Sequence, residues 1–287
     1  MPESAHCSQY SQLYLNHAKV RVGRFSCPAS SDDFASAGAI TLPTLVFPAT
    51  PTYICKSSGG RFLSDASKIN IYDGSSSYER QVCDPRGDHC HWLELDSEVF
   101  FNAIEAHPLK HFRISDKEIR LDQLLSNPGV NLMFYRMLQN LKAQQISAEA
   151  GFEQILILLA VLFNNAVPDK QTAQKVNKRK RWRALAEAAQ VAIARQPEKN
   201  QSISELANVL HTSEFHLCRV FKNIMGISVH QYRKLLRINL GIEQLAKETS
   251  ITEIAMSLGF ASPAHFSDVI KKGLGMSPRQ IRKQLLV

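Results

Sequence analysis

The residues with the clearest capacity for metal or redox chemistry lie in one short stretch of the N-terminal half. Cys83, His89, Cys90, His91 and Glu94 fall within twelve residues of one another. Imidazole, thiolate and carboxylate groups are the usual ligands of zinc and iron. On a strand, His89 and His91 point to the same face, whereas Glu94 turns to the opposite face. The pattern therefore lacks a complete metal triad, and metal binding or a Cys83/Cys90 redox switch is an alternative to an ordinary buried strand.

This cluster ends a segment that has the pattern of short strands. Between residues 30 and 95, short apolar runs alternate with Pro, Gly and Ser clusters, which predicts a sandwich or a small barrel. Between residues 97 and 167, apolar residues recur at helical spacing, so this part is expected to be mostly helical. Residues 1–167 are therefore predicted to form one domain.

The charge is distributed unevenly along the 287 residues. Residues 1–170 carry 15 Lys and Arg against 18 Asp and Glu, whereas residues 171–287 carry 19 against 8. A basic half beside a slightly acidic half is typical of a nucleic-acid-binding module joined to a module with another task. The polar, basic run at 168–183 predicts a linker that leads into a helix, and 184–287 the second domain.

The cysteines and the apolar segments indicate the compartment. Six cysteines are too sparse for a disulfide scaffold, and no CxxC pair is present. The N-terminus lacks the pattern of a signal peptide, and no apolar stretch approaches the roughly 20 residues of a membrane span. We expect a cytoplasmic protein with reduced thiols, no cofactor and no membrane contact.

The basic half contains an internal repeat. At an offset of 49 residues, segment 216–234 matches segment 265–283 at eight of 19 positions. Each copy predicts a short capped helix, a tight turn and a second amphipathic helix, which is the pattern of a helix-turn-helix unit. The units cover about 203–224 and 251–273, and the apolar series between them predicts one connecting helix. An all-helical interaction domain with solvated basic residues is the alternative.

These residues carry a close family resemblance. Ile203-Ser-Glu-Leu-Ala, Phe215-His-Leu-Cys-Arg-Val-Phe-Lys222, Ile251-Thr-Glu-Ile-Ala-Met-Ser-Leu-Gly-Phe260 and Gly275-Met-Ser-Pro278 resemble the arabinose-regulator (AraC/XylS) family over roughly residues 183–286. The resemblance implies an α+β chain with an N-terminal cupin-like β domain, flanking helices and a C-terminal all-α domain. It also implies that two recognition helices enter successive major-groove segments, roughly 34 Å apart.

By the same resemblance, the chain is a sequence-specific regulator of transcription, an activator rather than a repressor. Its partners would be double-stranded promoter DNA, RNA polymerase and a small effector held by unknown residues of the N-terminal domain. Helices at 132–141 and 151–163 would pair in a homodimer, unless they form a local hairpin that only covers the sheet. A metal-dependent cupin enzyme or a DNA-repair methyl acceptor would need a full metal triad or an activated cysteine, so no enzyme is expected.

The predicted DNA contacts differ between the two units. Arg219 is the expected base reader of the first unit, because its guanidinium matches guanine O6 and N7. In the second unit the chain departs from the family pattern, because Asp268 stands where Arg219 stands in the first copy. A carboxylate is repelled by phosphate, so this helix is expected to anchor rather than specify. The full set of expected contacts is Ser213, Phe215, Cys218, Arg219, Lys222, Ser262, Ala264, Ser267, Asp268, Lys271 and Lys272.

Overall fold

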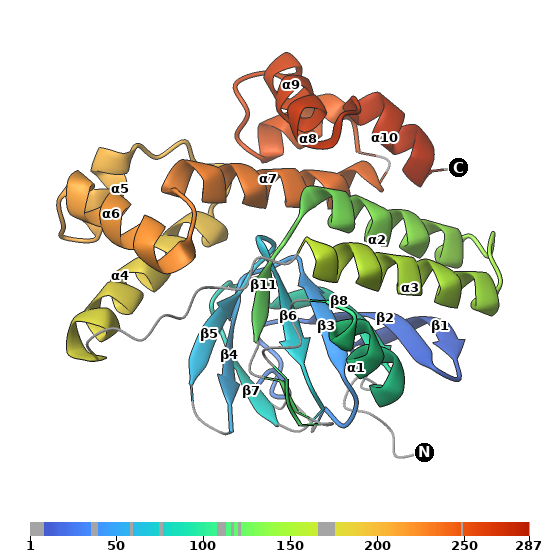
Figure 1. Ribbon diagram of the computed structural model, residues 1–287. Coiled ribbons are helices and arrows are strands. Elements are labelled where there is room, and N and C mark those ends of the chain that lie inside the picture. The colour runs from blue at the N-terminus through green and yellow to red at the C-terminus, as the bar shows by residue number, and fades with distance from the viewer. Residues whose placement is uncertain are drawn as a thin grey trace.

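The computed structural model shows a β-rich N-terminal half with helices above it, and a C-terminal half whose described residues form helices and their connections (Figure 1). It describes residues 9–35, 40–57, 60–74, 77–107, 113–115, 118–119, 122–165, 176–247 and 249–286. The expected α+β class is confirmed, with a β-rich N-terminal region and a helical helix-turn-helix region at the C-terminal side.

In the described residues, the N-terminal half contains two main antiparallel sheets and one short two-stranded ribbon. The larger sheet contains, in spatial order, β1 (Ser11–His17), β2 (Val20–Cys27), β8 (Asp88–Leu95), β3 (Thr44–Pro48), β6 (Lys68–Tyr72) and β11 (Gln123–Leu125). The smaller sheet contains β5 (Arg61–Ser64), β4 (Thr52–Lys56) and β7 (Tyr78–Gln81). A short ribbon of β9 (Arg113–Ser115) and β10 (Glu118–Ile119) stands apart. An apolar cluster that includes Phe25, Ile54 and Trp92 draws on strands of both main sheets.

The sheet begins earlier than the sequence pattern predicts. β1 and β2 precede residue 30, where the strand-rich segment was expected to start, and β9 to β11 interrupt the segment 97–167. β1 lies at the edge of the large sheet, and most of its side chains are exposed or half-buried. Its apolar run is limited to Leu13, Tyr14 and Leu15, which is too short to mark a strand clearly in the sequence.

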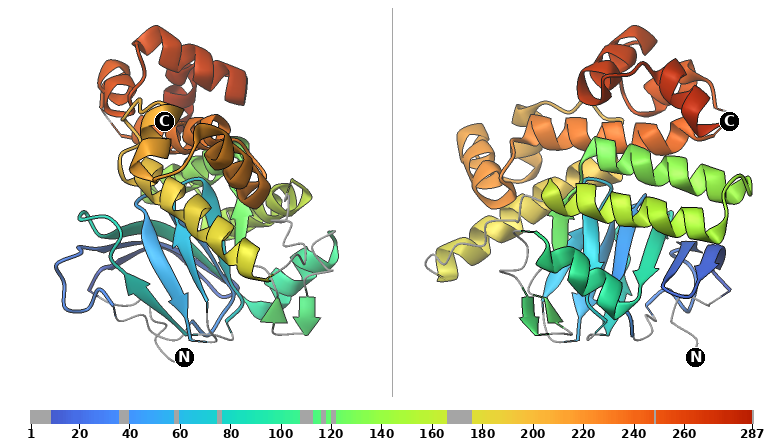
Figure 2. Two further views of the ribbon diagram at one scale, coloured as in Figure 1. Left: turned by 90° about the vertical axis from the view of Figure 1, so that its left-hand side faces the viewer. Right: turned by 45° about the vertical axis from the view of Figure 1, so that its right-hand side comes forward.

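The helices that the structure describes in the N-terminal half are α1 (Ser97–Glu105), α2 (Pro128–Lys142) and α3 (Ala148–Asn164). α2 and α3 lie side by side above the large sheet (Figure 2). The rings of Phe47 on β3 and Phe134 on α2 stack with centroids 3.8 Å apart, which joins the sheet to the helical layer.

In the C-terminal half, the described part of the chain forms seven helices. They are α4 (Val176–Arg195), α5 (Ile203–Val209), α6 (Glu214–Met225), α7 (Val229–Leu245), α8 (Ile251–Ser257), α9 (Pro263–Leu274) and α10 (Pro278–Leu285). α4 begins inside the segment 168–183 that the sequence pattern marks as a linker. α7 runs between the two helix pairs, α5 with α6 and α8 with α9 (Figure 1).

Local sequence sets where these helices begin. Ser202, Ser228, Ser250 and Ser277 each accept a hydrogen bond from the backbone N–H three residues later, and the Glu or Gln at that position bonds back. Such capping boxes satisfy two of the backbone donors that a helix start leaves unpaired. The repeat is therefore visible in the caps as well as in the buried residues.

The two halves share hydrophobic cores. One cluster joins the large sheet and α2 to Ile242, Phe266 and Ile281 of the C-terminal half. A second cluster joins Leu63 and Cys83 of the N-terminal half to α4 and the first helix pair. Each helix-turn-helix unit is therefore packed, through its own core, against a different part of the N-terminal half.

Hydrogen bonds fix α7 in this arrangement. The Tyr232 hydroxyl donates to Asp65 Oδ2 at 2.8 Å, and Asn239 Nδ2 donates to the Ala66 carbonyl at 2.7 Å. Both acceptors lie in the turn between β5 and β6, and the groups on both sides are buried. A buried polar group without a partner costs about 1–3 kcal/mol, so these bonds select one position of α7 on the N-terminal half.

A buried arginine on α7 joins the two units. Arg237 Nε donates to the Pro197 carbonyl at 2.7 Å, and its Nη1 donates to the Gly259 carbonyl at 3.1 Å. Pro197 lies between α4 and α5, and Gly259 lies in the turn of the second unit. Arg237 therefore ties the entry to the first unit to the turn of the second.

Gly259 and Gly226 provide a matched pair for testing this junction. Both have a positive φ, +72° and +73° respectively. A Cβ at Gly259 would collide with the backbone of Glu198, whereas a Cβ at Gly226 meets nothing within 4 Å. We expect Gly226→Ala to cost about 1 kcal/mol and Gly259→Ala about 3 kcal/mol of unfolding free energy, measured by urea denaturation. Equal losses would show that the Glu198 backbone does not constrain position 259.

Candidate nucleic-acid interface

The first helix-turn-helix unit presents a polar and aromatic face on α6. Ser213 caps this helix by accepting from the His216 N–H at 3.2 Å. Leu217, Val220 and Phe221 are buried on one side. The predicted contacts Phe215, Cys218, Arg219 and Lys222 are all exposed on the helix, Phe215 to 77%. An aromatic ring left this open on a well-packed helix is available to a partner.

The second unit repeats this scaffold with different exposed groups. Ser262 caps α9 by accepting from the His265 N–H at 3.1 Å, and Phe266 and Ile270 are buried. The expected contacts Ala264, Asp268, Lys271 and Lys272 are exposed. Ser267 is half-buried, and its hydroxyl donates to the Pro263 carbonyl at 2.8 Å. Its hydrogen is thus already used within the helix.

The connecting helix sets the distance between the units. α7 has 17 residues, which corresponds to about 25 Å of helix. Ala207 and Ala255, one in each unit, are buried at matching positions of α5 and α8. Because α7 is one uninterrupted helix held by Arg237, Tyr232 and Asn239, the two recognition helices have a defined mutual placement.

The sequence pattern missed one neighbour of the first recognition helix. Trp182 on α4 makes an edge contact with His216, with ring centroids 6.3 Å apart, and the Arg219 guanidinium lies 6.0 Å from the Trp182 ring. Trp182, Ala186, Ala189 and Ile193 recur at helical spacing, with the last three buried. That spacing was a usable signal, but the adjoining basic residues favoured a linker.

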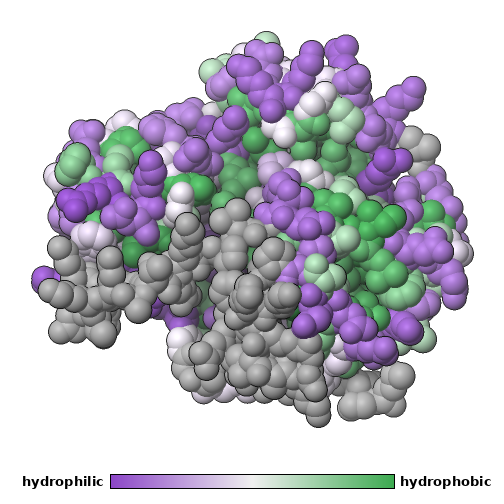
Figure 3. All heavy atoms as spheres, in the orientation of Figure 1, coloured by the Kyte–Doolittle hydropathy of each residue, from purple (hydrophilic) through white to green (hydrophobic). Residues whose placement is uncertain are grey.

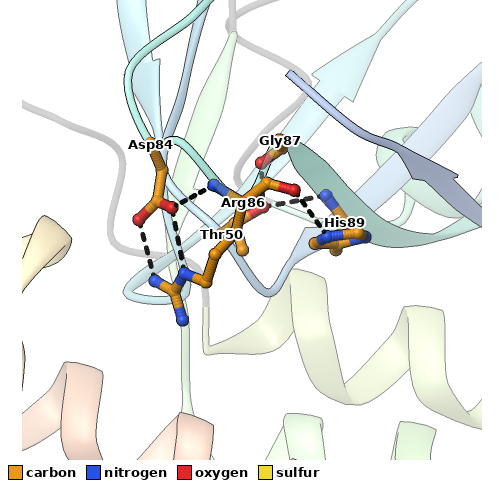
Figure 4. Close-up of polar contacts among 5 residues, drawn as sticks. All are labelled: Thr50, Asp84, Arg86, Gly87 and His89. Atoms are coloured by element: carbon orange, nitrogen blue, oxygen red, sulfur yellow. Dashed lines mark hydrogen bonds and ion pairs between the residues drawn. The ribbon is translucent and has the colours of Figure 1, made fainter. Parts of the chain in front are cut away.

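The stretch Cys83 to Glu94 forms a turn and a sheet strand, and the polar groups of the turn are hydrogen-bonded within the fold (Figure 4). His89 Nδ1 lies 2.8 Å from Ser26 Oγ, and its Nε2 lies 3.0 Å from the Arg86 carbonyl. The Thr50 hydroxyl donates to the Gly87 carbonyl at 2.7 Å and accepts from the His89 N–H at 2.8 Å. These bonds close the turn before β8.

His91 is separated from the other candidate ligands by packing. It lies under α2, where its ring makes edge contacts with Phe134 and Tyr135 at 6.1 and 5.4 Å. Burial lowers the pKa of His91 to about 3. Glu94 is paired with Arg21. Within the described residues, no three His, Cys, Asp or Glu side chains are grouped so that they can hold a metal ion.

The two cysteines of this stretch are buried in different places. Cys83 packs in the cluster that includes α4, and Cys90 packs between the sheets. Burial raises the pKa of Cys83 to about 11 and raises that of Cys90 well above its usual value. A thiol in this state carries little thiolate at neutral pH, which is the form that reacts. The separate burial sites and the raised pKa values of the two thiols both argue against a redox switch.

A narrow cavity lies between the two sheets. Buried polar side chains line it together with aromatic rings; the polar ones include Ser64, Asn70, Arg80 and Asp88. Arg80 Nε donates to the Phe34 carbonyl at 2.9 Å, and Arg80 Nη1 lies 3.9 Å from Asp88 Oδ2. Burial raises the pKa of Asp88 although Arg80 is near. Burying two charged side chains between sheets is costly in free energy. The Arg80–Asp88 pair therefore distinguishes this cavity from an ordinary apolar core.

The length and hydropathy of the described helices were compared with those of a membrane span. None of the helices in the described ranges combines the length and apolar content that a bilayer span requires.

Comparison with known proteins identifies the class to which this interface belongs. A family profile described as a helix-turn-helix domain matches residues 206–284. The chain is 34% identical over 89 residues to the HTH-type transcriptional regulator MtrA of Neisseria gonorrhoeae, covering 31% of this chain and 30% of MtrA. It is 32% identical over 93 residues to the probable transcription factor PqrA of Proteus vulgaris, covering 31% of this chain and 75% of PqrA.

A solved structure also aligns along most of the chain. The crystal structure of ToxT from Vibrio cholerae O395 aligns with 97% of this chain and 99% of its own, at 15% identity and a TM-score of 0.35. The chain spans about a third of the length of MtrA, so the sequence likeness concerns the C-terminal half. The chain belongs to the AraC/XylS family of helix-turn-helix transcriptional regulators.

Thiol reactivity tests the redox alternative directly. At pH 8 we expect Cys218, which is exposed, to react first with Ellman's reagent, while Cys83 and Cys90 react only as the protein unfolds. Cys7 lies outside the described residues, so a Cys7→Ser background isolates the others. Cys218→Ser should then remove the fast phase. A fast phase that disappears instead in Cys83→Ser or Cys90→Ser would revive the switch.

Proposed function

We propose that this protein binds promoter DNA sequence-specifically and activates transcription under the control of a small effector in its N-terminal domain. The observation that carries the proposal is the pair of capped, exposed recognition helices held by one connecting helix. RNA polymerase is the partner that an activator requires, and the cytoplasm is where it would act. No catalytic step is part of the proposal, and the relatives compared above are transcription regulators.

Within the proposal, the first unit specifies the sequence. Arg219 is exposed on α6 and is flanked by Trp182, which restricts the orientations open to its guanidinium. A bidentate contact to guanine is worth roughly 1–3 kcal/mol of discrimination. Phe215 supplies an apolar surface for a thymine methyl, and Lys222 supplies a cation for phosphate.

The second unit positions the protein. Asp268 is exposed where the first unit has Arg219, and the Ser267 hydroxyl is already bonded to the backbone. Lys271 and Lys272, in the last turns of α9, are the cations that remain for phosphate contacts. The unit therefore contributes affinity with little base readout.

Binding titrations test this division. The DNA for these titrations is a promoter site recovered by mapping bound DNA across the genome. We expect Arg219→Ala to weaken binding to this site by about tenfold or more, and Asp268→Ala to leave the affinity nearly unchanged. Arg219→Lys keeps the charge without the planar fork, so it should retain binding to scrambled DNA but lose the preference for the site. Equal losses in the Arg219→Ala and Asp268→Ala variants would contradict the asymmetry.

Within the proposal, the effector site is placed at the cavity between the sheets, because its lining is connected to α7. The cavity volume of about 10 Å³ has room for one water molecule, so the sheets must part for a ligand to enter. Asn70 Nδ2 donates to Ser64 Oγ at 2.7 Å, and both side chains line the cavity. Asp65, the next residue, accepts from Tyr232 on α7. A ligand that breaks the Asn70–Ser64 hydrogen bond would therefore disturb Ser64, the residue next to Asp65, to which Tyr232 of α7 is hydrogen-bonded.

A homodimer is assigned to α3. Most of α2 is buried against the sheet, α3 and the C-terminal helices, so its apolar residues are already used. α3, in contrast, exposes Leu156 to 42% and Ile157 to 57%, and apolar residues gather over α2 and α3 in Figure 3. By the family resemblance, the partner that covers this apolar face of α3 is a second copy of the chain.

Oligomeric state tests this assignment. We expect the double change Leu156→Lys and Ile157→Lys to convert a dimer to a monomer at micromolar concentration in light scattering, because two charges would be desolvated at the contact. Val209→Lys places a charge on another exposed apolar residue, away from α3, and should leave the dimer intact. A wild-type monomer, or dissociation by both variants, would contradict the role of α3.

A further inference from the structure

The basic segment at the start of α4 has no assigned role. Residues 176–183 contain five basic residues and no acidic one. The segment is helical from Val176, so its charges are carried on a rigid element rather than on a linker. Of the five side chains, the structure describes Arg181 and Arg183, and both are exposed. Among the described residues, neither is held in an ion pair.

The position of this segment is fixed relative to the recognition helix. α4 packs beside α6 (Figures 1 and 2). Trp182, between the two arginines, contacts both His216 and Arg219. Arg219 is one of the expected DNA contacts of α6, and His216 is exposed on the same helix. The arginines on either side of Trp182 are therefore carried at the margin of the surface that meets DNA.

The middle and C-terminal parts of α4 are attached to the rest of the protein, which limits how far the helix can move. Glu187 pairs with Arg61 of β5 at 2.7 Å, and the Arg61 guanidinium lies 4.2 Å from the Tyr53 ring. Ala186, Ala189 and Ile193 are buried in the core of the first unit. Because the helix is held along this length, its first two turns project as a fixed arm.

We infer that the first two turns of α4 form an additional DNA contact, in which Arg181 and Arg183 bind backbone phosphates beside the site read by α6. The inference rests on the proposed DNA binding and extends it to a third element. Arginine held in place by a rigid helix suits phosphate, because its donors form a planar fork and its charge is permanent. Phosphate contacts carry no sequence information, so this arm would add affinity equally to all sequences.

The salt dependence of binding separates this role from base reading. For the full-length double variant Arg181→Ala and Arg183→Ala, we expect the slope of log K against log salt to fall by about 1.8, because each phosphate contact contributes about 0.9. The loss of affinity should be the same on the recovered promoter site and on a scrambled duplex of equal composition. Changing both residues to Lys should preserve most of the slope, because the charges remain.

A matched control and a second measurement keep the inference falsifiable. Arg136→Ala removes an exposed arginine from α2 and should leave the slope unchanged. Shortening the duplex by half a turn beyond the α6 site should weaken the wild type but not the double alanine variant. A double variant with the slope, affinity and length dependence of Arg136→Ala would overturn the inference. A wild type with no preference for the recovered site would overturn the proposed function instead, whatever the arm does.

Discussion

The position of α7 depends on the buried hydrogen bond between Tyr232 and Asp65. Asp65 is fully buried and also accepts from the N–H and hydroxyl of Ser67, so its carboxylate is held in one orientation. Burial beside this carboxylate raises the pKa of Tyr232 well above its usual value and keeps the hydroxyl a donor. Since α7 carries one helix pair at each end, a single turn of the N-terminal half locates both recognition helices.

The C-terminal half was predictable because its signals are local. Ser202 with Glu205 and Ser250 with Glu253 mark helix starts within four residues, and the repeat showed that the same unit occurs twice. The exposed face of α6 followed from the spacing of Leu217, Val220 and Phe221 alone. Charge and spacing also located Arg219 on that face, although its contact with Trp182 was not visible.

The remaining features depend on contacts between distant residues. Tyr232 and Asp65 are 167 residues apart, and nothing near either one in sequence identifies its partner. The cavity lining comes from strands of both sheets, with Arg80 on β7 and Asp88 on β8. The sequence does not reveal that these two side chains are neighbours, because their contact depends on how the sheets pack together. His91 resembled a ligand because its sequence neighbours are His and Cys, whereas its spatial neighbours are the aromatic rings of α2.

The division of the apolar core has a consequence for how the protein can respond. The first unit shares its core with Leu63 and Cys83, whereas the second shares its core with α2 and the large sheet. A change in the N-terminal half can therefore reach the two units by separate mechanical routes. Loosening the contacts of Leu63 and Cys83 would disturb the packing of the first unit and leave that of the second intact, so the two units need not respond together.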